Sequence, residues 1–171
     1  PDFPTGGIII GLSGVRDASL KGKGKIVVQG KVDIEELKGG KSQIIIEEIP
    51  YMVNKAMLIK NIANLVKNKK IEGITDIRDE SDRRGLRVVL ELKRDAEPKI
   101  ILNLLYKHTQ LRNSFNSNMM AIVGKRPRML SVRDMLTLFI EHRQEVVTRR
   151  TKYQWKQAEK KAHILEGLKK A

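Results

Sequence analysis

The 171-residue sequence contains no cysteine, which excludes a disulfide framework, a cysteine-ligated zinc site and a thiolate nucleophile. Aromatic residues are only 4% of the chain. No apolar run approaches the roughly 20 residues that span a bilayer, so we expect no membrane partner. Acidic residues are also few: the 20 Asp and Glu are outnumbered by 34 Lys and Arg, which leaves a net charge of +14.

This excess of positive charge makes an anionic partner, above all nucleic acid, the leading functional class. The alternative is that the charge only solvates the surface. Residues 125–171 hold 13 basic and 5 acidic residues (+8), whereas residues 1–124 hold 21 and 15 (+6). The asymmetry predicts two units, residues 1–130 and 131–171.

Strand and helix signals alternate through residues 1–130. Ile8–Ile10 predicts a short buried strand, and Ser13 is a candidate cap for a helix ending near Leu20. A single extended run is predicted by the apolar positions Ile26, Val28, Val32 and Ile34. The glycine pair within residues 38–41 predicts a hairpin turn leading to a strand over residues 43–49.

Later segments complete the pattern. We expect strands over residues 71–77, 86–92 and 112–123, the last ending at a turn over residues 124–127. A helix should begin at Asn54 and bury Ile59, Ile62, Ala63 and Val66; another should begin at Pro98 and bury Ile100, Ile101, Leu104 and Leu105. The fold class is therefore α+β, a two-layer antiparallel sheet with helices on one side.

Residues 131–171 contain no proline and predict one long helix, capped by Ser131 with Asp134 three residues later. About 40 helical residues would reach about 60 Å. Because such a helix needs a partner or must project into solvent, we expect a coiled-coil arm whose returning helix is absent. The chain thus has the character of a piece of a longer protein.

Three possible chemical sites are weak. Gly40-Lys41-Ser42 lacks the earlier glycine of a phosphate-binding loop, since position 35 is Glu, and a strand follows it. Arg78, Arg83 and Arg84 interleave with the carboxylates of Asp76, Asp79, Glu80 and Asp82, which favours a salt-bridged turn over a metal site. The three histidines are scattered. We therefore expect no catalytic residue and no metal site.

Basic clusters are the remaining signal. Lys21, Lys23 and Lys25 alternate with glycines, and Lys125-Arg126-Pro127-Arg128 forms a second cluster. Without interleaved aromatics, these groups suit duplex phosphates rather than stacked single strands. Our first candidates for nucleic-acid contact are Lys21, Lys23 and Lys25, and the second are Lys41, Arg126 and Arg128. A single duplex arm requires residues 21–25 and 125–128 to share one surface.

Several short motifs stand out along the chain: Pro1–Gly7, Glu48–Lys55, Arg78–Asp82, Thr109–Leu111, Asn118-Met119, His142-Arg143, Val146–Arg150 and His163–Leu168. Together they resemble bacterial type II DNA topoisomerase breakage-reunion subunits. The resemblance extends over the whole chain. The Glu-Ile-Pro-Tyr and Thr-Gln-Leu segments are closer to the DNA gyrase A branch, and a segment of the topoisomerase IV counterpart is the alternative.

That resemblance implies a tower domain followed by the outgoing helix of a coiled-coil arm. The family's nucleophilic tyrosine follows an arginine in an upstream domain, whereas Tyr51, Tyr106 and Tyr153 follow Pro, Leu and Lys. The implied role is non-catalytic support of duplex gate-segment DNA within an ATP-dependent cytoplasmic enzyme. The implied partners are the remaining domains of the same polypeptide and an ATPase like the gyrase B protein. Together they would form an A2B2 assembly, with Mg²⁺ and ATP bound by the ATPase partner.

Two rival functions remain open from the residues alone. One is a stand-alone basic module that binds duplex nucleic acid. The other is a structural spacer between a catalytic domain and an exit gate, whose charge only steers DNA.

Overall fold

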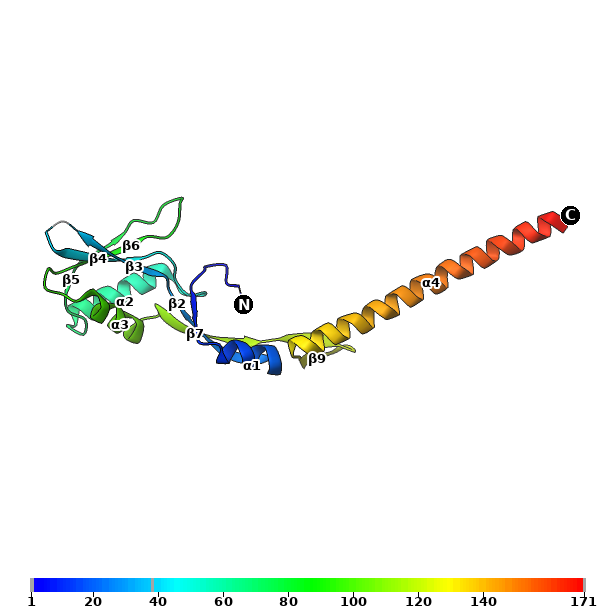
Figure 1. Ribbon diagram of the computed structural model, residues 1–171, viewed down its shortest axis with the longest axis horizontal. Coiled ribbons are helices and arrows are strands. Elements are labelled where there is room, and N and C mark those ends of the chain that lie inside the picture. The colour runs from blue at the N-terminus through cyan, green and yellow to red at the C-terminus, as the bar shows by residue number, and fades with distance from the viewer. Residues whose placement is uncertain (1, 38, 171) are drawn as a thin grey trace.

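The computed structural model describes residues 2–37 and 39–170, which form an elongated molecule with a compact α/β region at one end and one long helix at the other (Figure 1). In chain order the elements are β1 (Ile8–Ile10), α1 (Ser13–Lys21), β2 (Lys23–Gln29), β3 (Val32–Leu37), β4 (Lys41–Ile46), α2 (Lys55–Lys67), β5 (Ile74–Asp79), β6 (Val88–Leu92), α3 (Pro98–His108), β7 (Arg112–Asn118), β8 (Met120–Val123), β9 (Arg126–Met129) and α4 (Val132–Lys170). All pairings between these strands are antiparallel. The predicted α+β class is confirmed, with the strands divided among three sheets.

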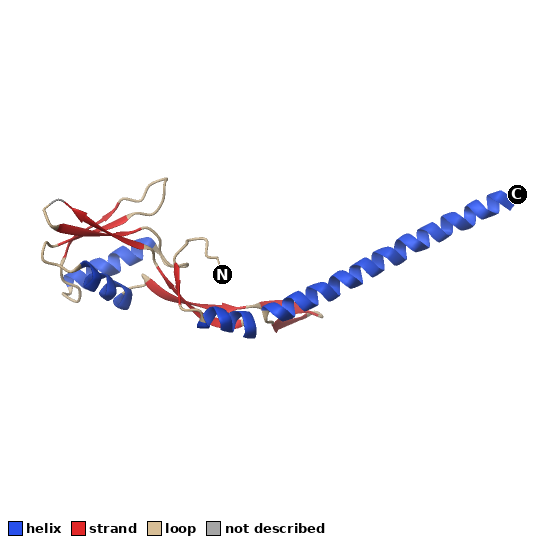
Figure 2. Cartoon of the chain, viewed as in Figure 1, coloured by secondary structure: helices blue, strands red, loops and turns tan. Residues whose placement is uncertain are grey.

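The main hydrophobic core lies under a four-stranded sheet of order β3-β4-β6-β5. Helices α2 and α3 lie on the same face of this sheet, as Figure 2 shows. Fully buried side chains from both layers meet in this core, among them Ile44, Leu90, Leu58, Ile62 and Leu105. The predicted cap of α2 is confirmed, because the Asn54 side chain accepts a hydrogen bond from the Met57 amide at 3.0 Å.

The buried faces of these two helices agree with the predicted ones only in part. In α2 the buried residues are Leu58 and Ile62, while Ala63 is exposed. In α3 the buried residues are Ile101, Leu105 and Tyr106, whereas Ile100 is 61% exposed. Neighbouring apolar positions allow either stripe, and packing against the sheet selects one of them.

A three-stranded sheet of order β1-β2-β7 joins the four-stranded sheet to the rest of the molecule. Helix α1 packs against β2 at very short range, because a Cβ on Gly14 would lie 1.9 Å from the Lys25 carbonyl oxygen. The helix begins at Ser13 as expected, but its N-cap is Leu12 and no side chain caps it. A strand forms at residues 8–10 as predicted, but the prediction that it is buried is wrong, since Ile8 is 47% and Ile10 42% exposed.

Residues 26–34 do not form the single extended run that their alternation predicts. β2 ends at Gln29 and β3 begins at Val32 in the other sheet. Between them, the Gly30 amide donates to the Leu111 carbonyl at 2.8 Å, and a Cβ on Gly30 would lie 2.5 Å from the Glu48 carbonyl oxygen. The chain therefore crosses between sheets at a point too crowded for any side chain.

The segment after β7 forms a hairpin that the sequence only partly predicts. Residues 120–123 are extended as expected, but Arg126 and Pro127 belong to β9 rather than to a turn. The turn consists of Gly124 and Lys125, both with positive φ (56° and 67°), as two-residue hairpin turns of type I′ require.

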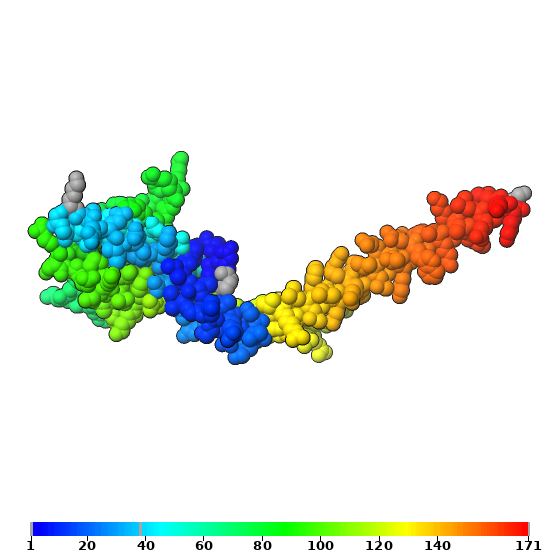
Figure 3. Space-filling model, in the orientation of Figure 1, coloured from blue at the N-terminus to red at the C-terminus, as the bar shows by residue number. Residues whose placement is uncertain are grey.

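Helix α4 begins with the predicted cap. The Asp134 amide donates to Ser131 Oγ at 3.1 Å, while the Ser131 amide and hydroxyl donate to Asp134 Oδ2 at 3.1 and 2.7 Å. Asp134 thus completes a capping box despite its short side chain. The helix then extends away from the α/β region (Figure 3), and none of its residues is buried. A coiled-coil partner and a division at residue 130 stay predictions.

Candidate nucleic-acid interface

Strand register places two of the predicted lysines side by side. Lys23 pairs with Asn118 and Lys25 with Asn116 across β2 and β7. Directly opposed residues of an antiparallel pair point to the same face, and alternate residues of a strand do so too. Lys23, Lys25, Asn116 and Asn118 therefore form one exposed patch.

The patch continues along the same sheet face, which we call the open face. It comprises the β2 residues Lys23, Lys25, Val27 and Gln29, the β7 residues Arg112, Ser114, Asn116 and Asn118, and the β1 residues Ile8 and Ile10. Three cations and four neutral polar side chains lie on this face, and none of its residues is acidic. Such a mixture of charges and uncharged hydrogen-bonding groups matches the side chains that contact nucleic-acid backbones.

The glycines between the lysines have a different role from the expected one. We expected them to let phosphates approach the backbone. A Cβ on Gly24 would instead lie 2.1 Å from the Gly14 carbonyl oxygen and 2.6 Å from the Ala18 amide nitrogen. Gly24 thus faces α1 on the covered side of the sheet, and its lack of a side chain permits close packing of helix on strand.

Lys21 differs from its two neighbours. It ends α1, and its ammonium lies 2.8 Å from the Asp17 carboxylate, one helical turn earlier. An open groove of about 500 Å³ beside α1 is lined by Asp17, all three lysines and residues 116–118. Lys21 borders the site, but part of its charge is already balanced by Asp17.

The other predicted contacts lie elsewhere. Lys41 begins β4 at the tip of the β3–β4 hairpin, where it pairs with Leu37 at the far end of the other sheet (Figure 1). The glycines of this turn have positive φ (86° and 73°), as expected for a hairpin, while Lys38 lies outside the described residues. The loop leads into a strand and does not open a helix.

Arg126 and Arg128 lie in β9 of the separate β8-β9 sheet. They pair with Val123 and Ala121 of β8, and they precede the buried Leu130 by four and two residues respectively. The pKa of Asp134 is lowered first by hydrogen bonds from Ser131 and further by the nearby charges of Arg128 and Arg133. Arg128 therefore lies toward the start of α4. Lys41 lies in a different sheet from Lys23 and Lys25, while joint contact of residues 21–25 and 125–128 with one duplex arm stays a prediction.

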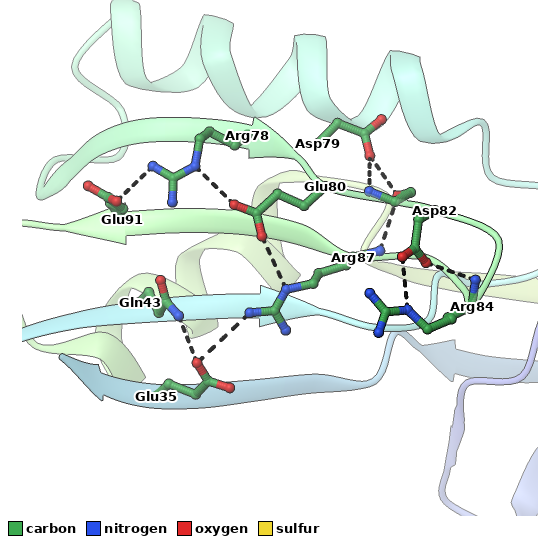
Figure 4. Close-up of polar contacts among 10 residues, drawn as sticks. Glu35, Gln43, Arg78, Asp79, Glu80, Asp82, Arg84, Arg87 and Glu91 are labelled. Carbon is green, nitrogen blue, oxygen red and sulfur yellow. Dashed lines mark hydrogen bonds and ion pairs between the residues drawn. The ribbon is translucent and has the colours of Figure 1, made fainter.

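The acidic segment forms the salt-bridged turn that its sequence predicts (Figure 4). Arg78 bonds Glu91 at 2.7 Å, Asp76 at 3.0 Å and Glu80 at 3.1 Å, while Arg84 bonds Asp82 and Arg87 bonds Glu80. Hydrogen bonds from Arg78 and Arg87 lower the pKa of Glu80, and those from the Arg84 amide and then its guanidinium lower the pKa of Asp82. The hydrogen bond to Glu91, followed by those to Glu80 and Asp76, raises the pKa of Arg78. The carboxylates are thus engaged by arginines.

Asp79 links this turn to the start of α2. Its carboxylate accepts from Lys55 Nζ at 2.7 Å and from the Ser81 hydroxyl at 2.6 Å. The hydrogen bond from Lys55, followed by that from Ser81, lowers the pKa of Asp79 to about 2. In the described ranges no group of three His, Asp or Glu side chains is arranged to hold a metal ion.

Two of the three tyrosines pack against other parts of the fold. Tyr51 contacts Phe3 and Phe115, with ring centroids 5.9 Å apart in both pairs. Tyr106 is buried at the end of α3, and burial raises the pKa of its hydroxyl. Tyr153 is exposed on α4. The absence of a catalytic tyrosine from this chain stays a prediction.

Sequence reasoning missed the part of the open face that β7 and Gln29 supply. A usable signal was present, because residues 112–118 read Arg-Asn-Ser-Phe-Asn-Ser-Asn and contain a single apolar residue. A strand this polar cannot bury both faces. Which face stays open depends on where α1 packs, and that contact is not visible in the sequence.

All 171 residues match the family of the A subunits of DNA gyrase and topoisomerase IV. This chain belongs to that family. The match confirms the resemblance to type II topoisomerase subunits inferred from short motifs. Motifs that indicate the family only weakly one at a time thus belong to one match that covers the whole chain.

Individual relatives come from both branches of the family. The DNA gyrase A subunit of Kosmotoga olearia is 55% identical over 172 residues, which cover 100% of this chain and 21% of the relative. That of Granulibacter bethesdensis is 53% identical, covering 98% and 18%. The DNA topoisomerase 4 A subunit of Bacillus subtilis is 52% identical, covering 100% and 21%. The chain spans about a fifth of the length of these relatives.

In the described part of the chain, no helix combines the length and apolar character that crossing a membrane requires.

Proposed function

We propose that this chain supports duplex DNA and connects gates within the A subunit of an ATP-dependent type II topoisomerase. It contacts the phosphates of the gate segment and takes no direct part in bond breaking. The proposal rests chiefly on the open face of the β1-β2-β7 sheet, where Lys23 and Lys25 lie together among neutral polar residues.

Physical chemistry favours a role in holding a bent duplex. Bending a stiff duplex costs roughly 1 to 6 kcal/mol or more, which extra phosphate contacts along the arms offset. Lys23 and Lys25 are two residues apart on one strand face, about 7 Å along the sheet. Both are exposed, so each can neutralise a phosphate without first leaving a buried environment.

The rest of the assembly follows from the family. We propose the remainder of the gyrase A polypeptide and an ATPase like the gyrase B protein as partners, in an A2B2 complex in the cytoplasm. Mg²⁺ and ATP would bind outside this chain, and the tyrosine nucleophile would come from another part of the gyrase A polypeptide. The chain alone is then inactive in DNA cleavage.

Duplex binding tests the proposal. The chain carrying Lys23→Ala and Lys25→Ala should bind a duplex more weakly than the unmodified chain, measured by fluorescence anisotropy across a salt series. Because each lost phosphate contact removes about 0.9 from the slope of log affinity against log salt, the slope should become shallower by about 1.8.

A matched control removes the same charge elsewhere. Lys60 and Lys67 are exposed on α2, which packs against the four-stranded sheet. Changing both to Ala should leave the slope nearly unchanged. If the two double variants behave alike, the lysines only contribute to net charge, and the spacer function is correct instead.

A further inference from the structure

Arg112 is held in a fixed orientation at the end of the open face opposite Lys23. It begins β7 and is the register partner of Gln29. Its Nε and Nη2 donate to Gln29 Oε1 at 3.0 and 2.7 Å. Its guanidinium also lies over the Tyr106 ring, 4.9 Å from the ring centroid.

These contacts fix the side chain without neutralising it. Gln29 supplies a neutral oxygen and Tyr106 a ring face, and the described residues show no carboxylate paired with Arg112. Arginine carries five N–H donors, of which Gln29 engages two. The side chain is exposed and keeps its full positive charge, so its remaining N–H donors can bind an anion. Because the guanidinium is already oriented, it loses less entropy when it binds.

Arg112 also lies in line with the two lysines. Its position is four residues from Asn116, the partner of Lys25, and six from Asn118, the partner of Lys23. At about 3.3 Å per residue, these separations are about 13 and 20 Å. A duplex rises about 3.4 Å per base pair, so the face spans roughly six base pairs.

We propose that Arg112 is an oriented phosphate-binding residue that sets where a duplex DNA backbone lies along the open face. This inference rests on the proposed function, because it assigns a further contact to the same surface. Lys23 and Lys25 supply mobile point charges at one end, whereas Arg112 offers a planar group of fixed direction at the other. A phosphodiester oxygen pair suits such a fork better than a single ammonium does.

The test uses the full 171-residue chain with a duplex of about 20 base pairs. Arg112→Ala should weaken binding roughly tenfold at low salt and reduce the salt slope by about 0.9. Arg112→Lys keeps the charge but loses the contacts that fix the guanidinium, so it should keep the slope and still bind several-fold more weakly. Gln29→Ala should resemble Arg112→Lys, because the charge remains while one of its two supports is lost.

Three results would overturn the inference. If Arg112→Ala binds like the unmodified chain while Lys23→Ala/Lys25→Ala is impaired, Arg112 is not a contact and the proposed function stands. If Arg112→Lys binds as well as the unmodified chain, the residue acts through charge alone. If both the lysine and arginine variants bind normally, the proposed function fails as well. Thermal melting of each variant checks that the sheet remains folded.

Discussion

At the residue scale, close contact between α1 and β2 depends on glycine. Changing Gly24 to Ala would place a Cβ 2.1 Å from the Gly14 carbonyl oxygen, so α1 must shift away from the strand. Overpacking of this kind typically costs about 1 to 3 kcal/mol. We expect Gly24→Ala to lower the free energy of unfolding by that amount, measured by urea denaturation.

Gly167 provides the contrasting substitution. It lies in α4 with no heavy atom within 4 Å of a Cβ built there. Alanine is the better helix former by roughly 0.5 to 1 kcal/mol, so Gly167→Ala should increase helicity slightly without destabilising the sheet. Equal stability of the Gly24→Ala and unmodified chains would show that α1 does not pack as described.

At the element scale, Asp79 joins the end of β5 to the start of α2 through Lys55. Its pKa is lowered to about 2 in the folded chain, from an ordinary value of 3.8. A lowered folded-state pKa stabilises the fold above the ordinary value and loses that effect as the pH falls toward 2. Asp79→Asn should therefore be less stable at pH 6, by up to about 1 kcal/mol for a partly exposed pair, and the difference should shrink between about pH 4 and pH 2.

Denaturation of both chains across this pH range measures the effect. Asp95→Asn is the matched control, since it removes an exposed carboxylate from the loop before α3. The control should be close to the unmodified chain at every pH. A stability difference for Asp79→Asn that does not change from about pH 6 to pH 2 would argue against the ion pair.

At the scale of the whole molecule, stability is concentrated in the α/β region. α4 has 39 residues and none of them is buried, although Phe139, Tyr153, Trp155 and Leu168 are large apolar side chains on its surface. Helical residues without a packing partner depend on local propensity and fray readily. We expect amides beyond Val147 to exchange with deuterium orders of magnitude faster than those of β4 and β6, measured by mass spectrometry or NMR.

Amides of α2 are the internal reference, because this helix buries Leu58 and Ile62 against the sheet. Protection of α4 equal to that of α2 would mean that another surface covers α4 in solution. A second copy of the chain could provide that surface by associating along the exposed apolar positions of α4, so the exchange should be compared at two protein concentrations.

Much of the fold could be predicted from local patterns. Asn54, Pro98 and the Ser131–Asp134 pair marked the starts of three helices, because capping depends on residues a few positions apart. The glycine pair before Lys41 marked a hairpin for the same reason. Family membership was also visible in the sequence, since the motifs that carry it are short and continuous.

The candidate site was only half predictable. Lys23 and Lys25 stand out by charge, whereas Gln29, Arg112 and Asn116 join them only through the register of β2 and β7. Arg128 is as basic as Lys25, yet it belongs to β9 in a different sheet. Charge density along a chain does not say which residues share a face once two distant strands have paired.

The sequence by itself determined most of the helix starts, the α+β class, the long helix and the family, because each depends on local conformational preference or on continuous identity. Only the tertiary structure decided where the chain leaves one sheet for the other, which faces are covered and which cations lie together. Those outcomes depend on contacts between distant segments, such as Gly24 with Gly14 and Gly30 with Leu111. The alternation of side chains along a strand defines two faces, and packing alone chooses which one meets solvent.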